Sequence, residues 1–592
     1  MEVQVSPGSH ARAVLRFQRV SRRWPAALKT ALAVAGPVFV AALLGRTEIG
    51  LVMSLGAFAV LYGPQTPGRF RFRLMSFAAI GLVLSALLGG VTAGHPVALL
   101  VVMVPLAALA AVACALLKVP PPGSYFFVLV CGVSGYLASS GVPLGQLVGL
   151  TAAGGAAAVL IGMIDLIWYP HRPERQAVAA AEEAVTRFEE AEPEEIRQVR
   201  PAASRALHHA WTTFRDSVGE RPLSPAAEEV FERIGILQTR YTRRSAALVD
   251  PALGGSEAQP WGSVEGEESS AEAAVFEPDF ESEQLRDSSL GRPDPTYLVR
   301  TGGRGPSEVW LIGARVGVAT LLAGVLAMLV GASHPYWAVA FATLVLHQGG
   351  TRHAQTVRGL QRLLGTVLGL GLFGLVLWWQ PGGVWLALLL FCLQVVVELL
   401  ILRNYAAAVV FITPLALTIA AAGGGWAGGV SAMSERGLDT VLAVAVALLV
   451  LWLVGRGTAL LFARAHARRC ILATESVMRD LAESRYATAA ARMNRRHLYY
   501  ELLELEQQVN QSLADEPKRV RPYLEMFQAV ATLGYLVLGA CWHPQVRRAR
   551  EAFGRATEPL QAIKAHPVTQ PRSPEDIHAD VLAVQNVITD WR

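Results

Sequence analysis

The chain has 592 residues, of which 53% are hydrophobic and only 17% are charged, and its formal net charge is +5. Ordinary soluble domains carry about 25% charged residues, and the mean hydropathy here is +0.37. This composition excludes a wholly soluble protein and predicts a membrane protein with soluble regions. The five cysteines form no CxxC pair, which argues against a disulfide framework or a zinc site.

Six apolar runs follow a basic N-terminal segment. Residues 1–25 hold five arginines and are predicted to be a cytoplasmic N-terminus. A membrane-spanning helix needs about 20 mostly apolar residues, and such runs lie near 26–45, 49–64, 74–94, 97–117, 123–140 and 146–169. We expect them to form a first transmembrane unit of six helices, residues 26–170. The stretch "SRRWPAALK" also resembles a twin-arginine export signal, although a cytoplasmic anchor before the first span explains it as well.

The middle region, residues 171–307, is predicted to be cytoplasmic and largely helical. Two sets of apolar residues recur at helical spacing, and each predicts one buried stripe. They are Leu207, Trp211, Phe214 and Val218, and Val230, Ile234, Leu237 and Tyr241. Between about 250 and 295 the chain is rich in Glu, Ser, Gly and Pro, a composition that cannot bury a core. We therefore expect a disordered acidic linker there.

A second set of six apolar runs follows. The runs lie near 309–331, 336–348, 360–379, 383–402, 405–422 and 437–463. They predict a second transmembrane unit of six helices, residues 308–465, and a cytoplasmic helical domain over residues 466–592. Within that domain the run 526–542 has 17 residues, just below a comfortable spanning length. We interpret it as a buried core helix, with a thirteenth span as the alternative.

The arginines between the spans indicate the topology, because cytoplasmic loops carry an excess of basic residues. The predicted outside loops hold little beyond Arg46 and Arg436, and each has an acid nearby. This bias places the N-terminus, the middle region and the C-terminus in the cytoplasm, in a multi-pass protein of the plasma (inner) membrane. The basic stretch 346–366 then lies where a cytoplasmic loop meets two spans. A metal site of His347 and His353 lacks acidic or cysteine ligands nearby.

The two sets of spans match each other in layout. Four pairs of residues correspond: Gly45 with Gly331, Gly63 with Gly349, Arg73 with Arg362, and Tyr125 with Tyr405. Both sets have six spans and start on the same side. We therefore predict an all-α fold of two six-helix transmembrane repeats, each followed by a cytoplasmic helical domain. An axis along the membrane normal would relate the two repeats.

Charged residues inside spans are costly and usually functional. Lys118 and Glu398 occupy equivalent positions of the two halves, so they form either a pair or two ends of a substrate path. Alternatively, Lys118 extends to the interface and Glu398 pairs with Arg403. Asp165, Asp439 and Glu398 are candidates for proton coupling, and either aspartate could instead cap a helix end.

Three further positions are candidates for a substrate path. Thr413 precedes Pro414 in a span, where proline removes a backbone donor and frees a carbonyl. Arg358 and Arg362 lie four residues apart, so they share one helix face at the predicted cytoplasmic start of a span. They either attract an anion, which the arginine fork binds well, or anchor the helix to anionic lipid.

No P-loop, G-x-S-x-G or H-E-x-x-H pattern occurs in the chain. The sequence therefore indicates neither ATP-driven pumping nor catalysis. We expect no enzyme activity, no catalytic residue, no cofactor and no metal site.

The second half resembles a known family. The stretches "HPYWAVAFATLVL", "RGLQRLLGTVLG", "ELLILRNYAAAVVFITPLAL" and "ERGLDTVLAVAVALL" resemble the fusaric-acid-resistance-like family of bacterial inner-membrane proteins, which is related to aromatic carboxylic acid efflux pumps. The resemblance implies a secondary exporter or channel-like conduit for small organic acids, aromatic ones included, or toxic compounds. Lys118, Glu398, Arg403, Tyr405, Thr413, Arg358 and Arg362 would then contribute to the substrate path.

Expected partners follow from this interpretation. They are the lipid bilayer, an anionic small molecule, a second copy of the chain and an accessory export protein; nucleic acid is not expected. The alternative function is a membrane scaffold or sensor that acts through its cytoplasmic helical domains.

The topology is testable with reporter fusions. A reporter placed after residue 171, 300 or 470 should be active only in the cytoplasm, because each position lies in or beside an arginine-rich inside segment. A periplasmic signal at any of these three positions would contradict the arrangement of two times six spans.

Overall fold

A computed structural model describes residues 17, 24–167, 169–192, 195–218, 224–247, 291–420, 429–485, 488–541, 550–565 and 572–589. Within these ranges the chain forms helices and turns and no β-strand. It divides into two compact units, the first made of residues 1–170 and 299–456, and the second of residues 171–298 and 457–592. The five N-terminal arginines and nearly all of the predicted linker at 250–295 lie outside the described residues.

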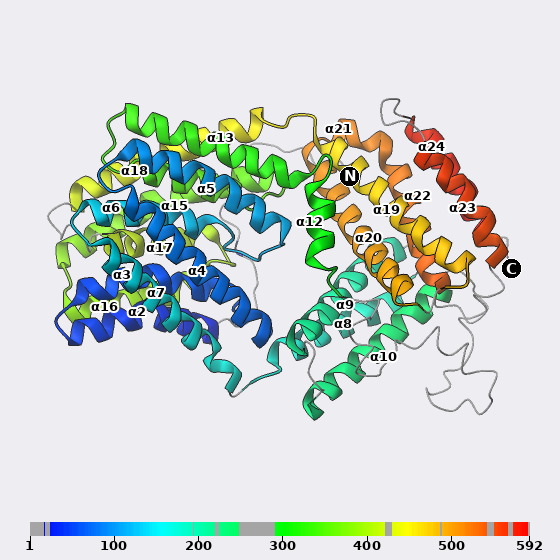
Figure 1. The fold of residues 1–592 in the computed structure, drawn as a ribbon, viewed down its shortest axis with the longest axis horizontal. Coiled ribbons are helices and arrows are strands. Elements are labelled where there is room, and N and C mark those ends of the chain that lie inside the picture. The colour runs from blue at the N-terminus through cyan, green and yellow to red at the C-terminus, as the bar shows by residue number, and fades with distance from the viewer. Residues whose placement is uncertain are drawn as a thin grey trace. The chain divides into compact units, whose positions relative to one another are not determined.

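The first unit contains one helix for each apolar run (Figure 1). The first half holds α2 (Trp24–Leu43), α3 (Thr47–Ala57) with the 3₁₀ turn η1 (Phe58–Leu61), α4 (Gly68–Val91), α5 (Pro96–Leu116), α6 (Tyr125–Ser139), and α7 (Leu144–Met163) with η2 (Ile164–Ile167). The second half holds α13 (Glu308–Leu329), α14 (Tyr336–Leu346), α15 (Arg352–Trp379), α16 (Gly383–Leu400), α17 (Tyr405–Ala420) and α18 (Gly429–Leu453).

Three of these helices, α4, α15 and α18, begin several residues earlier than the apolar runs predict; α4 begins at Gly68 rather than near 74. The helix α15 begins at Arg352 rather than near 360, and the hydroxyl of Thr351 caps it by accepting a hydrogen bond from the amide of Ala354 at 3.1 Å. The helix α18 begins at Gly429 rather than near 437. Three arginines that the sequence places at helix ends or in loops, Arg358, Arg362 and Arg436, therefore lie inside helices.

The first unit is built to lie in a membrane. Among the described residues, nine helices are long and apolar enough to cross one, eight of them in this unit, and four shorter apolar helices accompany them. Large apolar side chains such as Phe77, Val101, Leu160 and Leu375 are exposed on its helices, as a lipid-facing surface requires. The chain is an all-helical, multi-pass membrane protein.

The neighbours of each helix follow one pattern in both halves. In the first half, α3 packs on α2 and α7, and α4 packs on α6 and α7; in the second, α14 packs on α13 and α18, and α15 on α17 and α18. Across the halves, α2 packs on α16 and α13 packs on α5 (Figure 1). The first helix of each half therefore lies against the fourth helix of the other.

Glycines allow the closest of these helix contacts. A Cβ atom built on Gly89 of α4 would lie 1.9 Å from the carbonyl oxygen of Cys131 on α6, and one on Gly365 of α15 would lie 2.5 Å from the carbonyl oxygen of Ala406 on α17. Small residues let membrane helices approach to backbone contact, which replaces the missing hydrophobic drive with van der Waals packing.

The second unit is a helical domain with its own core. Its helices are α8 (Arg172–Glu190), α9 (Ile196–Val218), α10 (Pro225–Ala247), the start of α12 (Pro295–Gly303), α19 (Ala459–Ala482), α20 (Ala489–Asp515), α21 (Pro517–Val520) with η7 (Arg521–Tyr523), α22 (Leu524–Cys541), α23 (Arg550–Ala565) and α24 (Pro574–Thr589). Both predicted apolar stripes face this core. The run at 526–542 forms α22, which is long enough to span a membrane but buries Phe527, Leu533 and Leu538 in the same core.

A polar cluster holds the start of α12 on α20 in this unit. The hydroxyl of Tyr297 donates to Glu501 at 2.9 Å, and its ring stacks on His497 with centroids 3.7 Å apart. Arg469 of α19 donates to the other oxygen of Glu501 at 3.3 Å. Burial raises the pKa of Glu501 and lowers the pKa of His497 to about 4, so the imidazole of His497 is neutral at physiological pH.

The glycine contacts predict a position-dependent cost on α15. Replacing Gly365→Ala should lower stability by roughly 1–3 kcal/mol, because the added methyl group meets backbone atoms that cannot move away. Gly371→Ala on the same helix is the matched control, since nothing lies within 4 Å of its Cβ position. Denaturant titration of the purified proteins in detergent should separate the two; equal stability would contradict the close packing.

Candidate functional site

Two arginines are buried among aromatic rings in the middle of the first unit. Arg362 of α15 and Arg436 of α18 are each only 1% exposed. Their guanidinium carbons lie 4.4 and 4.3 Å from the ring centre of Phe341, and that of Arg436 lies 3.6 Å from the ring of Trp337. Phe341 and Trp337 are one turn apart on α14 and stack on each other. One helix thus presents the aromatic surface that supports both cations.

No carboxylate in the described part of the chain is hydrogen-bonded to either guanidinium group. Nε and Nη2 of Arg362 and all three nitrogens of Arg436 have no hydrogen-bond partner in the described part of the chain. The remaining nitrogen of Arg362 faces the hydroxyl of Tyr405, which is its hydrogen-bonding neighbour. An unpaired buried charge costs several kcal/mol, and here two like charges also repel each other. The arrangement therefore provides unused donors for an anion.

Two further polar groups border the arginines. Asp439 lies three residues after Arg436 on α18; it is 1% exposed, and neither of its carboxylate oxygens has a partner within the described ranges. Thr366 lies one turn after Arg362 on α15, and its buried hydroxyl is likewise unpartnered there. Tyr125 and Tyr336 are electrostatic neighbours of Arg436. The cluster thus combines cations, one carboxyl group and hydroxyl donors.

The residues of the basic stretch 346–366, at the start of α15, make different contacts. Arg358 is half-buried, and its Nη1 reaches the carbonyl oxygen of Val345 at 3.5 Å. His347 is buried, with Nε2 at 2.9 Å from the carbonyl oxygen of Pro122 and Nδ1 at 3.0 Å from that of Thr343. No group of three potential metal ligands occurs in the described part of the chain. His347 therefore ties the end of α14 to the loop before α6.

The predicted residues Lys118, Glu398 and Arg403 lie in separate surroundings. Lys118 is exposed in the loop after α5. Glu398 is buried on α16, a helix that packs on α2 and α17, and it accepts a long hydrogen bond from Gln394 at 3.5 Å. Arg403 is exposed in the turn that follows α16.

Thr413 takes part in helix packing. It is fully buried on α17, and its hydroxyl donates to the carbonyl oxygen of Val409 at 2.9 Å. A Cβ atom built on Gly369 of α15 would lie 2.7 Å from the Cβ of Thr413. This residue therefore stands at the close α15–α17 contact, with its polar atom already satisfied.

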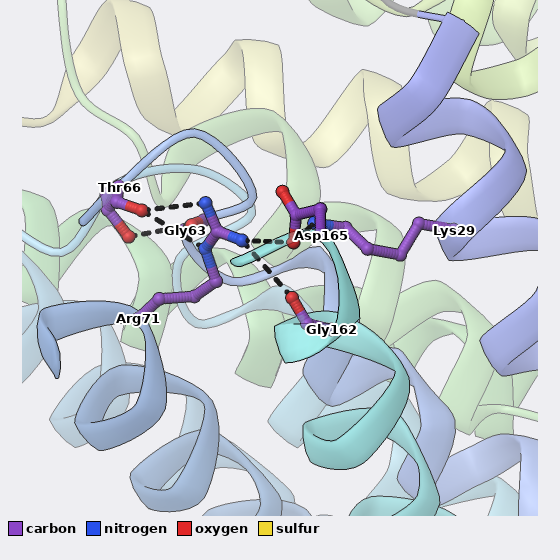
Figure 2. A network of polar contacts seen from close by, with 6 residues as sticks. All are labelled: Lys29, Gly63, Thr66, Arg71, Gly162 and Asp165. Atoms are coloured by element: carbon purple, nitrogen blue, oxygen red, sulfur yellow. Dashed lines mark hydrogen bonds and ion pairs between the residues drawn. The ribbon is translucent and has the colours of Figure 1, made fainter. Parts of the chain in front are cut away.

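Asp165 binds two cations at the end of α7 (Figure 2). Its Oδ1 accepts from Lys29 of α2 at 2.8 Å and from Arg71 of α4 at 2.7 Å. Arg71 also donates to the carbonyl oxygens of Thr66 and Gly162, which fixes its side chain. One carboxylate thus fastens three helices together.

In the second half, two arginines hold the end of the sixth helix without a carboxylate. Arg315 of α13 donates to the carbonyl oxygen of Val454 at 3.0 and 3.1 Å, and Arg352 of α15 donates to that of Gly455 at 2.9 Å. A cation from the first helix and one from the third therefore meet the end of the sixth helix in both halves. In the second half, the carbonyl end of α18 supplies the negative charge.

Sequence reasoning included Arg362, Tyr405 and Asp439 as site candidates but missed Arg436. Arg436 follows a Ser-Glu pair and was therefore assigned to an outside loop with Glu435 as its partner. In the structure Glu435 contacts His334 instead, and Arg436 turns inward. A usable signal was present in "HPYWAVAF", where Trp337 and Phe341 are spaced to form one aromatic face of a helix.

Comparisons with known proteins agree with this placement. Residues 321–450 match the family model described as fusaric acid resistance protein-like. This segment of the chain is similar to that family. The matched segment contains Trp337, Phe341, Arg362, Arg436 and Asp439, so the arginine cluster on α14, α15 and α18 lies within it. The resemblance seen in the sequence of the second half is thereby confirmed.

A relative extends the similarity beyond this segment. The chain is 29% identical over 489 residues to the uncharacterized membrane protein YvaC of Bacillus subtilis (strain 168). The aligned residues make up 77% of this chain and 75% of the relative. No solved structure matches the chain.

The carboxylate of Asp165 predicts a stability effect. Asp165→Asn leaves two buried cations, Lys29 and Arg71, beside a neutral group, and should lower the free energy of unfolding by roughly 1–3 kcal/mol. The loss stays below that of a fully buried pair because the side chain of Asp165 is 41% exposed. Glu48→Gln, on the exposed face of α3, is the charge-matched control and should cost less than about 0.5 kcal/mol. Indistinguishable denaturant midpoints would show that the pair contributes nothing.

Proposed function

We propose that this protein moves small organic anions across the plasma membrane, as a secondary exporter or a channel-like conduit, and that Arg362 and Arg436 bind the anion on its way. The observation that carries the proposal is the pair of buried guanidinium groups with no hydrogen-bonded carboxylate among the described residues. Their position inside the segment that matches a fusaric acid resistance protein-like family supports it.

The chemistry of the cluster favours a carboxylate. Arginine keeps its charge when buried, and its planar fork binds a carboxylate through two parallel hydrogen bonds. The low dielectric of the membrane interior strengthens that attraction. The rings of Phe341 and Trp337 hold the guanidinium groups and offer apolar surface to the organic part of a ligand. Tyr405 then orients Arg362 from α17.

Arg358 provides a step toward the cluster. It lies one turn before Arg362 on α15, nearer to the helix N-terminus, and is only half-buried. The N-terminal end of a helix carries partial positive charge, which also favours anions. We propose that an anion from the cytoplasm meets Arg358 first and then passes to Arg362.

Asp439 is the group that we propose for proton coupling. A buried carboxyl group without a partner is far less costly when it carries a proton, and this one lies one turn from Arg436. Protonation would cancel its attraction for Arg436 and leave that cation to the anion. Asp165, by contrast, is held by two cations, so we propose a structural role for it.

We also propose that the two halves derive from one six-helix repeat. The recurring helix neighbours and the cations that meet the end of the sixth helix in each half support this. The repeat is asymmetric in charge, because Arg73, which corresponds to Arg362 in the sequence layout, is exposed. Each chain would therefore have one anion site, in its second half.

Vesicle transport tests the proposal. In inside-out vesicles supplied with a panel of labelled aliphatic and aromatic carboxylates, beginning with benzoate, Arg362→Gln and Arg436→Gln should each lower uptake at least tenfold, because a lost bidentate contact to a charged ligand is worth about 1.5–3 kcal/mol. Lysine at either position should recover only part of it, since lysine keeps the charge without the fork.

Arg73→Gln is the matched control, an exposed arginine of the first half, and should transport like the parent protein. Normal uptake by both glutamine variants would contradict the binding role. If no carboxylate is transported while the second unit retains a protein partner in pull-downs, the scaffold or sensor alternative is favoured.

A further inference from the structure

We propose that His334, Glu435 and Tyr136 form a gate over the arginine cluster, at the end of the bundle opposite to the start of α15. The proposal rests on the function proposed above, because it assigns a closing device to that site. It also gives the first half of the chain, which contributes no buried arginine to the cluster, a part in transport.

The gate begins with a contact between the two helices that flank the cluster. Nδ1 of His334, just before α14, lies 2.5 Å from Oε2 of Glu435 on α18. Both side chains are 22% exposed, so they sit at the boundary between the packed interior and its surroundings. His334 and Glu435 therefore join α14 to α18 at their outer ends.

The contact lies immediately outside the site. Glu435 is adjacent to Arg436 in the sequence, and His334 is three residues before Trp337, on which Arg436 stacks. Between α14 and α18, His334 thus contacts Glu435 at the outer end, and Trp337 contacts Arg436 one turn further in. An anion leaving between α14 and α18 at this end has to pass the His334–Glu435 pair.

The first half covers this pair. The ring of Tyr136 on α6 meets His334 edge-on, with centroids 4.8 Å apart at 67°, and lies 6.2 Å from the ring of Tyr336. One turn earlier, Gly132 packs directly on Tyr336: a Cβ atom built on it would be 2.7 Å from the Cβ of Tyr336. The helix α6 therefore packs on the gate residues, and a movement of the first half would expose them.

The opposite end of α14 is tied to the first half in another way. The side chain of His347 contacts the carbonyl oxygen of Pro122, and within the first half Tyr62 holds the same loop by donating to the carbonyl oxygen of Gly123 at 2.6 Å. At this end the side chains of His347 and Tyr62 contact backbone carbonyls of the loop before α6, whereas at the outer end His334, Glu435 and Tyr136 meet one another through their side chains. Rotamer changes of these three side chains are enough to separate the outer contact, so we place the opening at the outer end.

Accessibility of a cysteine in the cluster tests the gate without any substrate. The reporter is Thr366→Cys in a full-length variant whose five native cysteines are replaced, and a membrane-impermeant methanethiosulfonate is added to either face of oriented vesicles. With the gate intact, labelling from the outer face should be slow. His334→Ala and Tyr136→Ala should each raise that outer rate at least tenfold and leave the rate from the cytoplasmic face unchanged.

Two variants serve as controls. Tyr136→Phe should behave like the parent, because the edge-on contact uses the ring rather than the hydroxyl group. His95→Ala removes an exposed histidine from the loop between α4 and α5 and should have no effect. Elution of each variant as a single species in detergent separates opening from unfolding, and if His334→Ala does not fold, Tyr136→Ala provides the test.

The outcomes separate the two proposals. Outer labelling that stays slow in both alanine variants, or that rises equally from the cytoplasmic face, overturns the gate even where anion transport is normal. Faster outer labelling supports the gate even where none of the carboxylates tested is transported. The absence of transport would then contradict the proposed function and not the gate.

Discussion

The structure of the membrane unit depends on how two buried arginines are kept in a low-dielectric interior. Arg362 and Arg436 cannot lose their protons, and no described carboxylate pairs with either. Their burial is made tolerable by the rings of Phe341 and Trp337, by the hydroxyl of Tyr405 and by the nearby charge of Asp439. Contacts with ring faces recover only about 2 kcal/mol when desolvated, which is less than the cost of a buried unpaired charge. An anion that binds between the guanidinium groups would supply the rest.

The helices around the cluster are arranged to hold α14 in place. This helix is short, and it contacts α13, α18 and α6. Both of its ends are fastened to the first half, by Tyr136 and Gly132 at one end and by the Pro122 carbonyl at the other. The same helix carries the aromatic face on which both arginines lie. A displacement of the first half would therefore move the surface that supports the charges, which is the coupling that a transport cycle needs.

The sequence predicted the helices well because membrane spans are set by length and hydropathy. Every apolar run became a helix, and the stripes of Leu207 and Val230 became core faces of the second unit. The prediction of helix bounds and burial from the sequence was wrong where a polar residue lies inside a helix. Arg436 and the first turns of α15 have the composition of loops, and only their tertiary partners explain why they are helical and buried. The suggested pairing of Lys118 with Glu398 relied on layout alone, and it stays a prediction.

A structure of the purified protein with an iodinated benzoate tests the central claim most directly. The account predicts iodine and carboxylate density next to Phe341, with the carboxylate within hydrogen-bonding distance of both Arg362 and Arg436. The account would be contradicted by a cluster without ligand density in which the side chain of Asp439 has turned to pair with Arg436, because the chain itself would then supply the missing anion.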